Sequence, residues 1–286
     1  MRPFQLTETT VDAGATRPFR LLHVTDTHIA RADEADDARK QDLARKRAAL
    51  FEADDPGCTI EHFGYAAAFA NQHDAILVHT GDLFDFVSHA HEQLAPELLS
   101  LPRDYLTTMG NHEYSLYVGE AFEDAKYKAL RIDRVQAMFP RYDVRFAARV
   151  VNGVNLVCLD DVYYDFTAEQ LGQLEAEVAK GLPIILFVHV PLYTPQLWEV
   201  MAGAAACSAV GVPAELMEGY DDYRYRQQIT TPQTRKYLDY LFGLDCLQAV
   251  FAGHLHLAHE SRLPNGAMQY VTDAQFRNAA RLIQVR

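Results

Sequence analysis

Short runs of apolar residues, each followed at once by a cluster of His, Asp or Asn side chains, recur along the chain. A run such as 75–78, with four consecutive apolar residues, leaves no polar face and is typical of a buried strand. Open α/β sheets carry their chemistry where such strands end. We therefore interpret the clusters as functional rather than as packing. They close the stretches 21–28, 75–85, 105–113, 184–189 and 249–256.

The rest of the pattern predicts helices and further strands. Helices are expected over 60–73, 88–100, 119–139, 167–180 and 232–243. Strands are expected over 4–12, 143–150, 155–159, 268–272 and 281–285, with Asn152-Gly153 and Pro264-Asn265-Gly266 in hairpin turns. Strands that alternate with helices, followed by adjacent strands, predict a layered α/β sandwich with mixed sheets.

No internal repeat or low-complexity linker divides the chain, so we predict one domain over residues 1–286. Two segments depart from the regular pattern. Residues 30–56 are dense in Ala and charged side chains, which favours a solvated helix or an excursion with no binding role. Residues 192–230 are irregular and rich in Gly, Pro and Tyr, and they follow His189 closely. A long irregular segment in this position is expected to form a cap over the site, and a folded surface insertion without ligand contact is the alternative.

Composition narrows the classes of partner. The formal net charge of −13 counts against general binding of nucleic acid, which usually requires a basic surface. No apolar run reaches the roughly 18 residues of a membrane span, and residues 1–8 lack the apolar core of a secretory signal. The cysteines at 58, 158, 207 and 246 are too widely spaced for a zinc knuckle. These features predict a cytoplasmic protein with reduced thiols.

The polar clusters contain side chains of the kind that bind metal ions. Oxygen and imidazole ligands without a thiolate suit Mn, Fe, Zn or Co, and they argue against calcium or an iron–sulfur cluster. Seven such residues are too many for one tetrahedral zinc, but they fit two ions if one carboxylate bridges. The candidates are Asp26, His28, Asp82, Asn111, His189, His254 and His256.

The spacing of these residues resembles a known family. The chain carries, in order, Asp26-x-His28, Gly81-Asp82-x-x-Asp85, Gly110-Asn111-His112-Glu113, Val188-His189 and Gly253-His254-x-His256. This series is similar to the calcineurin-like metallophosphoesterases in both order and interval, from about residue 20 to residue 260, and no motif position departs from it. The resemblance implies a four-layer α-β-β-α fold, in which two mixed sheets are flanked by helices.

The resemblance also implies a role for each ligand. It assigns two divalent or trivalent ions to each chain, with Asp82 as the bridging ligand. The first ion would be held by Asp26, His28 and His256, and the second by Asn111, His189 and His254.

Three further residues receive roles around the metal ions. His112 matches the family's catalytic histidine, which contacts the phosphate or protonates the leaving oxygen, as suits an imidazole that titrates near neutral pH. Asp85 and Glu113 are candidates to orient a ligand or a neighbouring histidine. For both carboxylates, capping of the following helix is an equal alternative. His23 and His79 lie inside apolar runs and are expected to be core or supporting residues. Asp160-Asp161 is expected to form a turn, and a reach toward the metal cleft is the alternative.

The function implied by the resemblance is that of a metal-dependent phosphoric ester hydrolase, which attacks a small-molecule phosphoester with a metal-bridging hydroxide. Aromatic and arginine side chains in 192–230 favour a small, nucleotide-like phosphodiester, with Tyr193, Arg224 and Arg226 as candidate substrate contacts. A phosphomonoesterase of the same fold is the alternative. A nuclease is weighed because Gly81 to Asp85 is similar to the motif of double-strand-break repair nucleases, but the acidic charge counts against it. The intact ligand set counts against a non-catalytic interaction scaffold.

Overall fold

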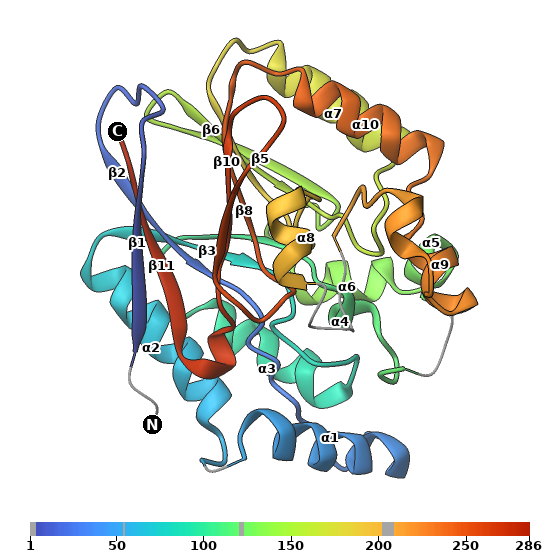
Figure 1. Ribbon diagram of the computed structural model, residues 1–286. Coiled ribbons are helices and arrows are strands. Elements are labelled where there is room, and N and C mark those ends of the chain that lie inside the picture. The colour runs from blue at the N-terminus through green and yellow to red at the C-terminus, as the bar shows by residue number, and fades with distance from the viewer. Residues whose placement is uncertain (1–3, 54, 120–122, 202–208) are drawn as a thin grey trace.

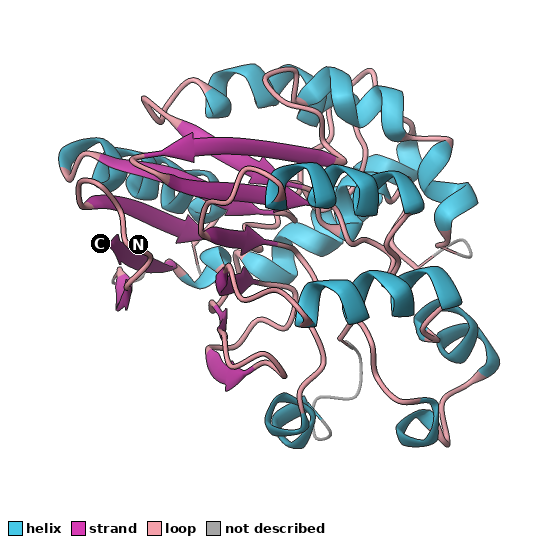
Figure 2. Cartoon of the chain, turned by 90° about the horizontal axis from the view of Figure 1, so that it is seen from above, coloured by secondary structure: helices cyan, strands magenta, loops and turns pink. Residues whose placement is uncertain are grey.

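Two mixed sheets lie face to face in the computed structural model, which describes residues 4–53, 55–119, 123–201 and 209–286 (Figures 1 and 2). The first sheet has the order β1-β11-β2-β3-β4, and the second has the order β5-β6-β7-β8-β10-β9. The strands of the first sheet are β1 (Gln5–Val11), β2 (Phe19–Val24), β3 (Ala75–Thr80), β4 (Tyr105–Thr108) and β11 (Ala279–Val285). Those of the second are β5 (Phe146–Val151), β6 (Val154–Leu159), β7 (Ile184–Phe187), β8 (Leu247–Ala252), β9 (His259–Arg262) and β10 (Met268–Val271).

Helices cover the outer face of each sheet. Helix α2 (Cys58–Gln72) packs on β2 and β3, whereas α7 (Ala168–Val178) packs on β5 and contacts α10 (Pro232–Phe242). The other helices are α1 (Ala38–Phe51), α3 (His89–Leu99), α4 (Asn111–Tyr114), α5 (Ala125–Ala129), α6 (Ile132–Met138), α8 (Pro195–Met201) and α9 (Asp222–Gln228), with 3-10 turns η1 (Ala214–Met217) and η2 (Gln275–Arg277). In the described residues, no helix combines the length and the apolar character that a membrane crossing needs.

The alternation of side chains along the strands explains the layers. In β2, Leu21 faces the second sheet and joins Ile185 and Phe251 in the core between the sheets. Its neighbour Leu22 points the other way and packs in the core that includes the helix residue Phe63. Successive side chains of a strand face opposite sides, so a continuous apolar run buries both. This arrangement confirms the predicted four-layer sandwich.

Several local predictions need correction. The segment 119–139 contains α5 and α6 rather than one helix, because the chain turns at Leu130 and Arg131, where no Gly or Pro marks a break. Residues 120–122 of this segment lie outside the described residues, as do 202–208 of the predicted cap and Cys207 within them.

The cap and the C-terminal hairpin also differ from prediction. The segment 192–230 is not simply irregular, because it contains α8, η1 and α9. The predicted turn at Asn265 joins β9 to β10, and β9 was not expected. β11 then crosses to the first sheet, where it pairs with β1 and β2. A strand that changes sheets leaves no local signal in a hydrophobic pattern.

Candidate metal centre

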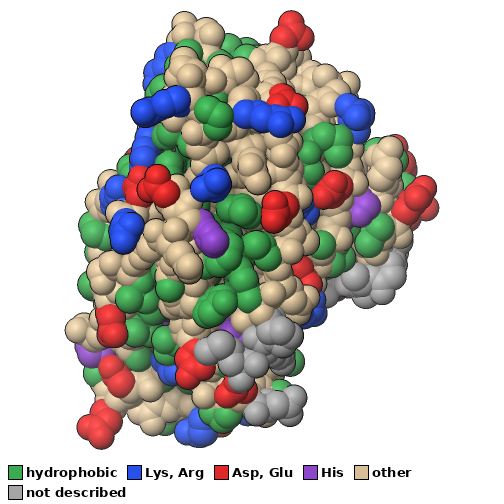
Figure 3. All heavy atoms as spheres, turned by 90° about the vertical axis from the view of Figure 1, so that its left-hand side faces the viewer, with side chains coloured by type: hydrophobic (Ala, Val, Ile, Leu, Met, Phe, Trp, Pro, Cys, Tyr) green, Lys and Arg blue, Asp and Glu red, His purple; other side chains and the backbone are tan. Residues whose placement is uncertain are grey.

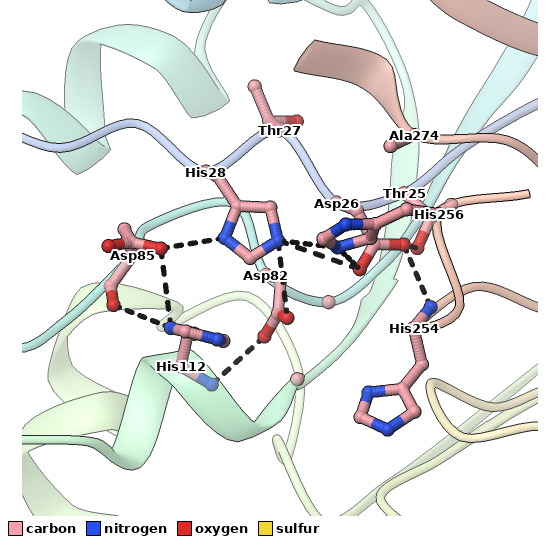
Figure 4. A network of polar contacts seen from close by, with 12 residues as sticks. Thr25, Asp26, Thr27, His28, Asp82, Asp85, His112, His254, His256 and Ala274 are labelled. Carbon is pink, nitrogen blue, oxygen red and sulfur yellow. Dashed lines mark hydrogen bonds and ion pairs between the residues drawn. The ribbon is translucent and has the colours of Figure 1, made fainter. Parts of the chain in front are cut away.

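The structure brings all seven predicted metal ligands together at one edge of the two sheets. Six of them lie on the loops that follow the carboxyl ends of β2, β3, β7 and β8, and Asn111 opens the short helix α4 after β4. Strands β2, β3 and β4 are mutually parallel, as are β7 and β8, so within each sheet these ends point the same way. Figure 4 shows five of the seven side chains converging from separate segments of the chain.

Unusual backbone conformations aim these side chains. Of nine non-glycine residues with positive φ in the described chain, five are predicted ligands. They are Asp26 (φ 55°), His28 (φ 52°), Asp82 (φ 57°), His254 (φ 69°) and His256 (φ 52°). A left-handed conformation costs a non-glycine residue roughly 1–3 kcal/mol and persists only where the surroundings enforce it. Because five such residues occur together here, the ligand loops are held in conformations that lower the stability of the fold.

The first cluster is formed by Asp26, His28 and His256, whose ligand atoms lie within 4.8 Å of one another. Asp26 Oδ1 is 3.3 Å from His256 Nε2 and 3.8 Å from His28 Nε2. The two Nε2 atoms approach to 2.9 Å. His28 Nδ1 donates its hydrogen to Asp85 at 2.8 Å, so in the neutral ring Nε2 carries a lone pair. Two imidazole nitrogens and a carboxylate that converge in this way fit a shared cation.

Asp26 provides a direct test of that fit. Its Oδ2 accepts hydrogen bonds from Thr25 Oγ1 (2.7 Å) and from the backbone N–H of His254 (2.8 Å). Its Oδ1 is buried and has no hydrogen-bond partner among the described residues. A buried carboxylate oxygen without a partner is costly. A metal ion bound to Oδ1 removes that cost, so the residues present fit a metal.

The second cluster is formed by Asp82, His189 and His254 together with Asn111. His189 Nε2 lies 3.2 Å from Asn111 Oδ1, 3.2 Å from His254 Nδ1 and 3.3 Å from Asp82 Oδ2. His189 Nδ1 donates to the carbonyl of Thr80 at 2.7 Å, which directs the Nε2 lone pair of the neutral ring inward. The cluster therefore presents three different ligand types to one point.

Asp82 connects the two clusters through a single oxygen. Its Oδ1 accepts the backbone N–H of His112 at 2.9 Å. Its Oδ2 faces His189 Nε2 at 3.3 Å on one side and His28 Nε2 at 3.7 Å on the other. One carboxylate oxygen between two ligand clusters fits a bridging role between two metal ions.

The electrostatics of the centre favour a cation. Burial lowers the pKa of His189, but the carboxylate of Asp82, with smaller help from Asp26, reverses this effect and raises the pKa to about 10. Burial raises the pKa of Asp82, yet the surrounding histidines hold it well below its usual range. The buried carboxylates of Asp82 and Asp26 thus favour a positive charge beside them. Without a metal, the proton on His189 provides that charge, and a bound metal ion would provide it instead.

Glycine is required where the motif loops touch. A Cβ on Gly253 would lie 1.9 Å from Thr25 Oγ1 and 2.5 Å from Asp26 Oδ2. A Cβ on Gly81 would lie 2.3 Å from the backbone nitrogen of Gly110. These contacts are far below van der Waals distance, so any larger residue would push the ligand loops apart.

We expect Gly253→Ala to lower the free energy of unfolding by about 1–3 kcal/mol, as overpacking does, and to weaken metal binding by displacing Asp26. Urea unfolding and a Mn²⁺ titration measure the two effects. Gly172→Ala in α7 is the matched control, because its Cβ meets nothing within 4 Å. It should leave metal binding unchanged. Metal affinity in Gly253→Ala equal to that of the wild type would contradict the close-contact argument.

The two candidate supporting carboxylates take different positions. Asp85 Oδ1 accepts from His28 Nδ1 at 2.8 Å and lies 3.3 Å from His112 Nδ1, so Asp85 contacts both a ligand and the candidate catalytic histidine. Glu113 accepts the backbone N–H groups of Asp82 (2.8 Å), Phe84 (3.0 Å) and Gly110 (2.8 Å). Glu113 thereby caps α4 at Gly110 and also ties two motif loops together.

Other supporting residues were assigned no role, or a different one, from the sequence. Asp161 takes the less favoured of its two expected positions, near the metal cleft, where its Oδ1 accepts the backbone N–H groups of His189 (3.1 Å) and Val190 (3.0 Å). His79 Nε2 contacts Thr27 Oγ1 at 2.9 Å, in agreement with a supporting role. Arg47 of α1 binds Asp85, although its charged segment was assigned to solvent. Nothing in the local pattern distinguishes Arg47 from the other basic residues of that helix.

A cavity of about 360 Å³ lies beside the ligand clusters, and Asp82, Asn111 and His112 form part of its wall. The rest of the wall includes Ser115, Glu123, Tyr163, Tyr164, Tyr223 and Arg224. Arg224 thus lies on the wall of this cavity, and its contact with substrate stays a prediction. The structure does not place Tyr193 or Arg226 on this wall. Tyr193 lies against Trp198 beside a separate cavity, and exposed Arg226 forms an ion pair with Asp222 (2.8 Å).

Among solved structures, the fold is similar to that of a dimetal phosphatase from Danio rerio, with a TM-score of 0.50, 12% identity, and coverage of 91% of this chain and 88% of that chain. The protein TT1561 of Thermus thermophilus aligns at a TM-score of 0.46 and 10% identity, covering 91% of each chain. A 5′-nucleotidase from Candida albicans aligns at a TM-score of 0.43 and 16% identity, and the alignment covers 96% of this chain and 47% of that chain. At these identities the likeness concerns the fold alone.

A search of curated proteins found no match to the sequence. The family model of the calcineurin-like phosphoesterases, by contrast, matches residues 19–258, a range that contains both ligand clusters and His112. The chain therefore belongs to the calcineurin-like phosphoesterase family and is a metal-dependent phosphoric ester hydrolase.

Proposed function

We propose that the protein hydrolyses small, nucleotide-like phosphodiesters with two bound metal ions. The observation that carries this proposal is the position of Asp82 Oδ2 between two ligand clusters that border one cavity. When bound, two ions in such a site supply an activated water as nucleophile and neutralise the charge on the phosphoryl oxygens. Asp26, His28 and His256 would hold one ion, and Asn111, His189 and His254 the other, with Asp82 shared.

His112 is proposed as the residue that protonates the leaving oxygen. Its Nδ1 donates to the backbone carbonyl of Asp85 at 2.7 Å, which leaves Nε2 as the atom available to a substrate. Burial lowers the pKa of His112, but the charges of Asp82 and Asp85 outweigh burial, so the net shift is upward. A raised pKa keeps more of the imidazole protonated near neutral pH, as proton donation requires.

The cavity wall supports a diester as substrate. Tyr163, Tyr164 and Tyr223 offer ring surfaces for a base or sugar, and Arg224 offers a partner for a phosphate oxygen. Glu123 contributes a carboxylate to the same wall and accepts from Ser115 Oγ at 2.5 Å. Burial raises the pKa of Glu123, and Arg224 offsets its charge, so the charge of the wall does not select between the two ester classes. The three tyrosine rings beside Arg224 favour a diester, because they offer contact surface for the organic groups on either side of the phosphate.

A small substrate also suits the charge of the whole protein better than nucleic acid does. The net charge is −13, and on the face shown in Figure 3 acidic and basic side chains occur together among apolar ones. A nuclease needs a basic track for the phosphate backbone. We therefore favour a small-molecule phosphodiesterase over the nuclease alternative.

The substrate class is tested by hydrolysis of bis-p-nitrophenyl phosphate and p-nitrophenyl phosphate, with metal-stripped protein reloaded separately with Mn²⁺, Fe²⁺, Zn²⁺ or Co²⁺. The oxygen and nitrogen ligands are compatible with all four metals. We expect metal-dependent turnover with a higher kcat/KM for the diester. A higher value for the monoester would replace the proposed class by a phosphomonoesterase.

We expect Arg224→Ala to raise KM for the preferred ester about tenfold or more and to change kcat less, because a charged hydrogen bond to phosphate contributes about 1.5–3 kcal/mol. Steady-state kinetics measure the change. Arg226→Ala is the matched control, since that side chain lies on the same helix but pairs with Asp222 outside the cavity. Equal effects of the two substitutions would argue against a substrate contact by Arg224.

A further inference from the structure

Asp85 is held by a side chain from outside the family motifs. Arg47 of α1 donates from Nε to Asp85 Oδ2 at 2.5 Å and from Nη2 to Asp85 Oδ1 at 2.8 Å. Asp85 is fully buried, whereas Arg47 is 21% exposed. A two-point contact between a guanidinium and a carboxylate fixes the plane of the carboxylate as well as its position.

That fixed plane determines what Asp85 offers to its other neighbours. Oδ1, the oxygen bound by Nη2, also accepts from His28 Nδ1 at 2.8 Å and lies 3.3 Å from His112 Nδ1 (Figure 4). Rotation of the carboxylate would break the hydrogen bond to His28 and move Oδ1 away from the His112 ring, whose own bond to the Asp85 backbone carbonyl (2.7 Å) would remain. Arg47 thus acts on two imidazoles, one in the first ligand cluster and one proposed as proton donor, without touching either.

Helix α1 is anchored at both ends against the site, so Arg47 is not a freely moving surface side chain. At its C-terminal end, Phe51 stacks on the His28 ring with a centroid distance of 4.3 Å and an interplanar angle of 9°. At its N-terminal end, Asp37 accepts a hydrogen bond from the Tyr117 hydroxyl at 2.5 Å. Tyr117 directly precedes residues 118 and 119, which belong to the cavity wall. Good helix formers and the Asp37 N-cap maintain the helix between these two points.

We propose that Arg47 is a positioning residue of the phosphoesterase reaction, which holds Asp85 so that His112 and His28 keep their reactive orientation. This inference rests on the proposed role of His112 and assigns a task to a segment that the sequence pattern leaves to solvent. Arg47 itself touches neither the cavity wall nor a proposed ligand. Its influence is therefore expected in the rate of the chemical step rather than in substrate binding.

The test compares Arg47→Ala, Arg47→Lys and the control Arg45→Gln in metal-saturated protein. Arg45 lies on the same helix but is exposed and pairs with Asp42. The substrates are bis-p-nitrophenyl phosphate and diphenyl phosphate, or the matching monoesters if the wild type prefers those. Phenoxide is the stronger base, so its departure depends more on a proton from His112.

For Arg47→Ala, we expect kcat on diphenyl phosphate to fall roughly 10- to 100-fold, the usual cost of losing such a supporting contact, with a smaller loss on the p-nitrophenyl ester and KM nearly unchanged. Millimolar guanidinium chloride should restore part of the rate. Arg47→Lys, which keeps the charge but loses the fork, should be intermediate. Wild-type kinetics in Arg47→Ala, equal losses on both substrates, or full activity in Arg47→Lys would overturn the proposal.

A second readout does not depend on turnover. In zinc-loaded protein with ¹⁵N-labelled histidine, the Nδ1–H signals of His28 and His112 report their contacts with Asp85, and His112→Asn assigns the second signal. We expect both to shift in Arg47→Ala and to stay in place in Arg45→Gln. Unchanged signals in Arg47→Ala would refute the positioning role, whatever the activity of the wild type. Absence of ester hydrolysis by the wild type would refute the proposed function but not this structural role.

Discussion

Asp82→Asn is expected to lower kcat/KM at least about a thousandfold and to leave fewer than two metal ions per chain. Asparagine tolerates the left-handed backbone at this position (φ 57°) and keeps one side-chain oxygen, so the loop can retain its shape. What it loses is the negative charge between the two clusters. Bridging metals contribute several kcal/mol to catalysis, and each 1.36 kcal/mol is a factor of ten in rate.

Two measurements check this expectation, namely steady-state kinetics on the preferred ester and metal content by elemental analysis after gel filtration. Asp42→Ala is the control, because exposed Asp42 pairs with Lys46 and Arg45 on α1, away from the cavity wall. It should behave as the wild type does. Two tightly bound ions in Asp82→Asn would contradict the bridging role.

His112→Asn is expected to lower kcat by about 10²–10⁴-fold while the protein retains its metal ions. The loss should be largest on substrates with a strongly basic leaving group, because those need a proton most. Retention of metal separates this variant from Asp82→Asn, in which metal and activity are lost together. The substitution removes the imidazole whose pKa Asp82 and Asp85 raise, and it leaves both carboxylates in place.

The comparison of kcat on p-nitrophenyl and phenyl esters, with metal content on the same samples, checks the role of His112. His73→Asn is the control, since His73 precedes the amino end of β3, opposite to the end that leads to Asp82. A uniform loss on all leaving groups would assign His112 to phosphate binding rather than proton donation. Loss of metal would show that it supports the ligand clusters instead.

The parts of the site that lie on strand ends were predictable from the sequence. In each of these parts, an apolar run is followed by polar residues at short fixed intervals, as in Asp26-x-His28 and His254-x-His256. Both features are local and can be recognised in the sequence. The fold then needs only parallel strands to bring such ends together. The pattern also predicted a layered α/β sandwich with mixed sheets, whereas the four-layer order was implied by the family resemblance.

Contacts between distant segments were not predictable in this way. Arg47 meets Asp85 across 38 positions, and Asp161 meets His189 across 28, with no periodicity that links the partners. In the segment 192–230, Gly and Pro suggested irregular chain. The short helix α9 forms there with local support, because Asp221 caps its N-terminus and Asp222 pairs with Arg226 four residues on. Its helical turn separates Arg224, which faces the cavity, from Arg226, which does not.

The central claim is that two metals act together at the clusters joined by Asp82. Its most direct test is a titration of metal-stripped wild-type protein with Mn²⁺, in which bound metal and hydrolysis of bis-p-nitrophenyl phosphate are followed on the same samples. We predict that the metal-free protein is inactive and that activity reaches its maximum at two ions per chain. Full activity without metal, or a maximum at one ion per chain with no second ion bound, would contradict the claim.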